Sequence, residues 1–80
     1  MENMFADKYK KLGANIALFR RVRGLSQLEL AEKINVSRTH ISRIENSDSA
    51  VSLDVVFAIA QALDVPVHRL FDFDNRIIEL

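Results

Sequence analysis

Several residue types are scarce in this sequence, and each absence narrows the classes of function. No cysteine occurs among the 80 residues, which excludes disulfide scaffolds, thiolate zinc sites and cysteine nucleophiles. His40 and His68 lack the spacing of metal ligands, so we expect no metal and no cofactor. The longest apolar run, Val55 to Ala60, has six residues, whereas a membrane helix needs ~18. Met1 to Ala6 does not resemble a signal peptide. We therefore expect a cytoplasmic protein with no membrane anchor.

Glycine and proline are also rare, with two and one respectively, while 49% of the residues are hydrophobic. That composition argues against disorder, and a chain of this length has room for one core. The apolar residues recur at helical rather than alternating spacing. The sequence therefore predicts an all-α domain over residues 1–71, followed by a C-terminal tail over 72–80.

Five helices are predicted, at about 7–23, 27–34, 38–46, 52–64 and 67–71. Apolar residues three or four apart define their buried faces, and Gly24 ends the first helix. Ser26 and Glu29 form a capping box that starts the second helix, and Asn35 suits the left-handed turn at its end. Ser37 caps the third helix. In the last helix, Leu70 and Phe71 are predicted to fill the core.

The second and third helices, joined by Asn35-Val36-Ser37, form a helix-turn-helix. Nine residues make a helix about 13 Å long, which suits a major groove ~12 Å wide. Arg can pair with guanine and the Thr methyl can contact thymine. We therefore predict double-stranded DNA as the partner, read by Arg38, Thr39 and Arg43.

The residues of this region also resemble those of the Cro and phage-repressor helix-turn-helix family, often called the XRE family. The resemblance spans residues 10–71 and is strongest in Leu25-Ser26-Gln27-x-Glu29-Leu30-Ala31-Glu32-Lys33 and Val36-Ser37-Arg38-x-x-Ile41-Ser42-Arg43-Ile44-Glu45-Asn46. It implies that Gln27 contacts the DNA backbone, braced against the recognition helix, and that Asn46 binds phosphate. It also implies a structural ion pair between Arg20 and Glu45. Further backbone or secondary contacts are predicted for Ser37, His40 and Ser42.

Two departures from the family pattern lie at helix ends, since Asn35 and Ser47 stand where the family usually has glycine. Asn tolerates a left-handed backbone, so Asn35 is an easy replacement. A left-handed Ser47 would cost about 1 kcal/mol or more. We therefore expect a differently shaped loop after the third helix, with Asp48 placing a negative charge near the expected phosphates.

The net charge of zero is unusual for a nucleic-acid binder, but the charges are unevenly distributed. Residues 1–46 contain nine Lys and Arg against five Asp and Glu, a balance of +4, and residues 47–80 contain two against six, a balance of −4. We expect the acidic half to face away from DNA. The cluster of Arg20, Arg21 and Arg23 is either a solvated helix end or a steering group for phosphate.

Surplus apolar residues point to self-association, and the candidates are Phe57, Phe73, Ile77 and Ile78. The leading hypothesis is a homodimeric transcriptional regulator, a repressor or operon controller, on a near-palindromic operator. The alternative is a protein-interaction module, such as an antitoxin or adaptor, whose helix-turn-helix surface binds a protein partner. An enzyme is not expected, because so short a chain can hardly enclose a catalytic pocket.

Overall fold

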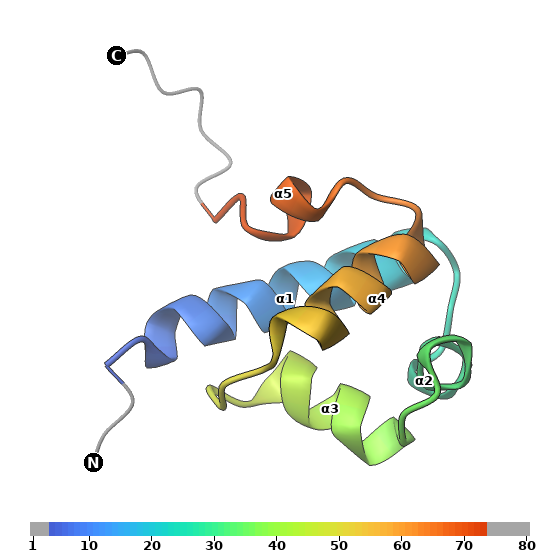
Figure 1. Ribbon diagram of the computed structural model, residues 1–80, viewed down its shortest axis with the longest axis horizontal. Coiled ribbons are helices and arrows are strands. Elements are labelled where there is room, and N and C mark those ends of the chain that lie inside the picture. The colour runs from blue at the N-terminus through green and yellow to red at the C-terminus, as the bar shows by residue number, and fades with distance from the viewer. Residues whose placement is uncertain (1–3, 74–80) are drawn as a thin grey trace.

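The computed structural model describes residues 4–73 and contains helices only in that part of the chain. They are α1 (Ala6–Val22), α2 (Gln27–Ile34), α3 (Arg38–Asn46), α4 (Leu53–Leu63) and α5 (Val67–Leu70). In Figure 1, α1 and α4 lie side by side across the middle, with α3 on one side of them and α5 on the other. The all-α, five-helix prediction is confirmed, and every helix boundary lies within one residue of the predicted one.

Local sequence signals define most helix ends. Ser26 makes both hydrogen bonds of its capping box with Glu29, and Ser52 caps α4 by accepting from the Val55 amide. Asn35 ends α2 in the left-handed region, at φ 60°. Asp64 ends α4 in the same way, at φ 55°, which the sequence analysis did not anticipate. Its carboxylate side chain is short and polar, which makes the left-handed conformation tolerable.

The core is formed by one apolar face from each helix. Its fully buried side chains include Ile16 of α1, Leu30 of α2, Ile41 of α3, Ile59 of α4 and Leu70 of α5. Because every helix contributes, the position of α3 depends on packing with the rest of the domain.

Close packing of α1 against α3 requires a glycine. At Gly13, which is buried in α1, an added Cβ would overlap the carbonyl oxygen of Ile44 and crowd Glu45 of α3. The backbones of the two helices therefore approach at a point where no side chain fits. This contact fixes the C-terminal half of α3 against α1.

Two predictions about the C-terminal aromatic residues are wrong. Leu70 fills the core as expected, but Phe71 is 42% exposed. Phe73 was expected to lie outside the domain, yet it is half-buried against the core, with its ring centroid 6.1 Å from that of Phe71. Asn15 draws this segment toward α1, because its Nδ2 donates to the carbonyl oxygens of Leu70 (3.0 Å) and Asp72 (3.1 Å). Ile77 and Ile78 lie outside the described residues.

Candidate nucleic-acid interface

The predicted reading face is the outer surface of α3. Ile41 and Ile44 point into the core, so α3 turns its opposite side outward. Arg38, Thr39 and Arg43 are all exposed there. In Figure 1, α3 forms one edge of the molecule, and α5 lies beyond α1 and α4 on the opposite side. The structure thus leaves the three predicted base-reading side chains together and accessible.

The predicted backbone-contacting residues surround this face, and some of their polar atoms already have partners. The Ser37 hydroxyl accepts from the His40 amide at 3.0 Å as the N-cap of α3. Asn46 donates from Nδ2 to the carbonyl oxygen of Ser42 at 2.9 Å, back along the helix. His40 is exposed and Ser42 is half-buried. Ser37 and Asn46 therefore support the helix itself, whatever else they contact.

A buried ion pair holds the base of the interface. Arg20 and Glu45 meet through two hydrogen bonds, Nε to Oε2 at 2.7 Å and Nη2 to Oε1 at 3.0 Å. Their side chains are only 9% and 2% exposed. Arg20 also donates from Nη1 to the Leu25 carbonyl oxygen at 2.7 Å, just before α2. This one guanidinium therefore connects α1 to α3 and to the start of α2. Its hydrogen bond to Glu45 raises the pKa of Arg20 above its ordinary value.

A chain of hydrogen bonds runs from this ion pair to the reading face. Gln27 donates from Nε2 to Glu45 Oε1 at 3.0 Å. The Arg38 guanidinium, in turn, donates from Nη1 to Gln27 Oε1 at 3.2 Å. A carboxylate can only accept, so the amide nitrogen of Gln27 must face Glu45 and its oxygen must face Arg38. The buried pair thus determines which way Gln27 points and what it offers to Arg38.

A polar cavity of about 230 Å³ lies between α3 and the loop that follows it, lined by His40, Arg43, Ile44, Ser49 and Ala50. Ser47 is extended, at φ −121° and ψ 170°, so this loop avoids the left-handed turn that glycine would permit. A left-handed Ser47, with the strain that it would carry, does not occur. Sequence reasoning did not include Ser49, which no local pattern marked.

The arginine cluster at the end of α1 has separate roles. Arg20 belongs to the buried pair described above, and Arg21 is exposed. Arg23 donates to the carbonyl oxygens of Leu63 at 2.7 Å and Asp64 at 2.9 Å, where α4 ends. Cationic side chains commonly satisfy the last carbonyls of a helix in this way. Arg20 thus forms the ion pair that the family resemblance implied, and Arg23 is an exposed residue that also binds the end of α4.

Exposed acidic residues occur on several elements. Asp54 lies in the first turn of α4, Asp64 ends that helix, and Asp72 follows α5. Asp48 lies in the loop directly after α3. Within residues 4–73, no cluster of three or more His, Asp or Glu side chains could hold a metal ion. No helix in the same range is long and apolar enough to cross a membrane.

A protein-family model described as "Helix-turn-helix" matches residues 16–70. Among curated proteins, the chain is 33% identical over 66 residues to Control protein C.SmaI of Serratia marcescens, covering 82% of this chain and 79% of that protein. It is 39% identical over 54 residues to Antitoxin PezA of Streptococcus pneumoniae, covering 68% of this chain. The chain spans only 34% of the length of that antitoxin.

Solved structures give the same grouping. The restriction-modification controller protein C.AhdI from Aeromonas hydrophila superposes with a TM-score of 0.81 at 29% identity, covering 86% of this chain and 100% of that one. SinR, described as a master regulator for biofilm formation and solved in complex with DNA, superposes with a TM-score of 0.72 at 35% identity. That match covers 76% of this chain and 98% of the solved one.

Proposed function

Because the chain belongs to the helix-turn-helix family of Cro and the phage repressors, we propose that it is a sequence-specific double-stranded DNA-binding transcriptional regulator. It acts as a repressor or operon controller, without a catalytic step, in the cytoplasm. Two copies place their α3 helices in successive major grooves of a near-palindromic operator, about 34 Å apart.

The observation that carries the proposal is the hydrogen-bonded chain from Arg20 through Glu45 and Gln27 to Arg38. A guanidinium has five N–H donors, and this chain uses one of Arg38's. The others remain to pair with the O6 and N7 acceptors of a guanine, the contact best suited to arginine. Because the Arg38 side chain is already held in place before binding, it loses less conformational entropy when it contacts the base.

The remaining candidates divide into two kinds of contact. Thr39 and Arg43 share the exposed face with Arg38, and we assign them to base edges. Gln27, Ser37, His40, Ser42 and Asn46 border that face, and we assign them to phosphates or secondary contacts. The polar cavity beside His40 supports a phosphate contact for that residue, since an imidazole N–H can donate to an anion there.

The proposal can be tested by selecting bound sequences from a random pool of double-stranded DNA. The proteins compared are the native chain, Arg38→Ala and Arg21→Ala. The salt concentration is about 150 mM, because purely electrostatic binding is weakened there. Arg21 is the matched control, because its loss removes the same charge from an exposed position outside α3. We expect an inverted repeat from the native chain and from Arg21→Ala. Arg38→Ala should lose preference at one position of each half-site, by ~1–3 kcal/mol. A pool without any motif, bound only at low salt, would contradict sequence-specific regulation.

A second candidate function is protein binding by an antitoxin or adaptor, which the similarity to Antitoxin PezA favours. The zero net charge is also unusual for a nucleic-acid binder. The combined variant Arg38→Ala with Arg43→Ala separates the two functions. If the chain is a DNA-binding regulator, this variant should no longer be retained on DNA. If the helix-turn-helix surface binds a protein instead, the variant should no longer capture its protein partner, and DNA binding should not matter.

A further inference from the structure

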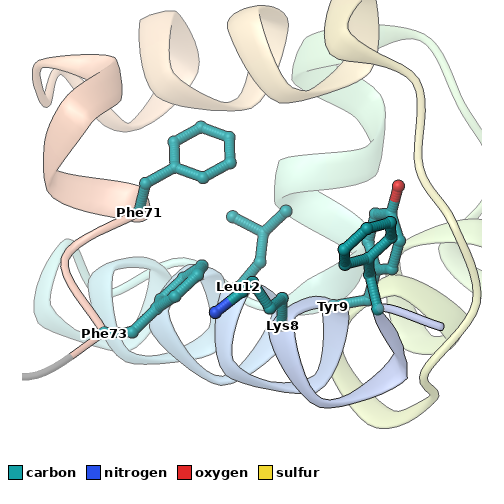
Figure 2. A pocket seen from close by; sticks show the side chains of 6 residues that line it. Lys8, Tyr9, Leu12, Phe71 and Phe73 are labelled. Carbon is teal, nitrogen blue, oxygen red and sulfur yellow. The ribbon is translucent and has the colours of Figure 1, made fainter.

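An apolar and a polar cavity of the domain have the same volume, about 230 Å³, but different chemistry. Aromatic and aliphatic side chains dominate the apolar one, where Figure 2 shows Phe71 and Phe73 on one side of Leu12. The polar one, between α3 and the loop after it, includes His40 and Ser49 in its lining. A phosphate group needs convergent hydrogen-bond donors, and the polar cavity supplies them.

The backbone holds both donors of the polar cavity in place. The His40 amide donates to the Ser37 hydroxyl at 3.0 Å, in the first turn of α3. The Ser49 amide donates to Ser47 Oγ at 3.0 Å, and Ser47 Oγ donates to Ser49 Oγ at 2.9 Å. A hydroxyl that accepts in this way keeps its own proton to donate elsewhere. The Ser49 hydroxyl and the His40 imidazole can therefore donate to the same anion.

The charge of this cavity depends on pH through His40. Among residues 4–73, the other charged residue in the lining is Arg43, which stays cationic at every relevant pH. Glu45 of α3 is held in the buried ion pair, and Asp48 of the loop and Asp54 of α4 lie outside the lining, as do all charged residues of α1. A neutral imidazole has one N–H donor, whereas the protonated form has two and a positive charge.

We propose that His40 couples operator binding to the uptake of a proton. In the complex, a phosphate of the DNA backbone occupies the polar cavity and accepts hydrogen bonds from the protonated imidazole and the Ser49 hydroxyl. The phosphate binds an imidazolium more strongly than a neutral imidazole, so binding takes up one proton from solvent and dissociation releases it. Operator affinity therefore increases as pH falls through the range of about 5–8 in which imidazole titrates. This inference rests on the proposed function, because it concerns the regulation of the same DNA-binding face.

Fluorescence anisotropy tests the coupling, with the duplex that the native chain selects from the random pool. The native chain should bind about five- to tenfold more tightly at pH ~5.5 than at pH ~8.5, because a charge-assisted hydrogen bond replaces a neutral one. His40→Gln keeps an N–H donor but cannot be protonated, so its affinity should be the same at both pH values. His68→Gln is the matched control, because His68 is exposed on α5, on the opposite side of the domain from α3 (Figure 1), and this variant should keep the native pH dependence.

The salt dependence of binding provides a second measurement. For the native chain, the slope of log affinity against log salt should be steeper at the lower pH by ~0.9 for each bound copy, since one more phosphate is neutralised. His40→Gln should show the same slope at both pH values. Ser49→Ala should bind more weakly than the native chain at both pH values and keep the pH dependence. Thermal melts at both pH values verify that each variant is folded.

The results that would overturn the proposal differ from those that would refute the proposed function. Specific binding by the native chain with no pH dependence, or a pH dependence that survives in His40→Gln, would overturn the coupling. Native affinity in Ser49→Ala would show that the phosphate does not occupy the cavity. If no sequence is selected at either pH, the proposed function itself is wrong.

Discussion

In a Glu45→Gln variant, the buried Arg20 guanidinium keeps its charge but loses the carboxylate that neutralises it. Glu45 accepts two hydrogen bonds from Arg20 and one from Gln27, and its side chain is 2% exposed. The amide that replaces it presents an N–H group toward donors that need an acceptor. An unpaired charge and an unsatisfied donor are then both buried.

Breaking a buried ion pair by removing one partner typically costs about 3–5 kcal/mol. An 80-residue domain has a total stability of roughly 4–12 kcal/mol, at about 0.05–0.15 kcal/mol per residue. Glu45→Gln should therefore remove a quarter or more of the free energy of unfolding. For a domain of this size, each kcal/mol lowers Tm by about 4–8 °C, so the expected drop is at least about 12 °C.

Urea unfolding followed by circular dichroism measures the effect, together with Arg20→Met, Glu45→Leu and the variant carrying both changes. Well-packed apolar residues can replace a buried ion pair at little cost, so the double variant should recover most of the loss. It should nevertheless bind DNA with weaker base discrimination, because Gln27 no longer has Glu45 to orient it. A loss below about 1 kcal/mol in Glu45→Gln, or strict additivity in the double variant, would refute the reasoning.

Three further predictions concern local structure. Gly13→Ala should destabilise the domain by about 1–3 kcal/mol in urea unfolding, since its Cβ overlaps the Ile44 carbonyl, whereas Ala14→Gly, on the exposed side, should cost only about 1 kcal/mol. Asn35→Ala should lower stability by about 1 kcal/mol because φ is 60°, and Asn35→Gly should be close to neutral. The Ser26 amide lowers the pKa of Glu29, so this carboxylate stabilises the fold above its ordinary pKa of 4.5, and the benefit is lost as pH falls through the lower folded value. Glu29→Gln should therefore be less stable than the native chain at pH 7, with a gap that closes in acid.

The sequence by itself determined the helices and their order. Short-range signals suffice for these, because a cap such as Ser26 or a left-handed Asn35 acts within four residues of its own position. The outward face of α3 was equally predictable, since the periodicity of Ile41 and Ile44 determines which side is buried. The resemblance to the repressor family also placed Arg20 near Glu45, and the structure brings these two together.

Only the tertiary structure decided the contacts between distant segments. Arg23 donates to the Leu63 carbonyl oxygen at the end of α4, 40 residues further along the chain. Gly13 leaves room for the backbone of α3. No local sequence pattern identifies either contact partner. Phe71 and Phe73 exchanged their expected roles, because Asn15 holds the chain after α5 against α1 and turns Phe73 toward the core edge. Composition indicates how many apolar residues must be buried. Which of them are buried depends on which surfaces of the helices pack together, and the packed domain determines this.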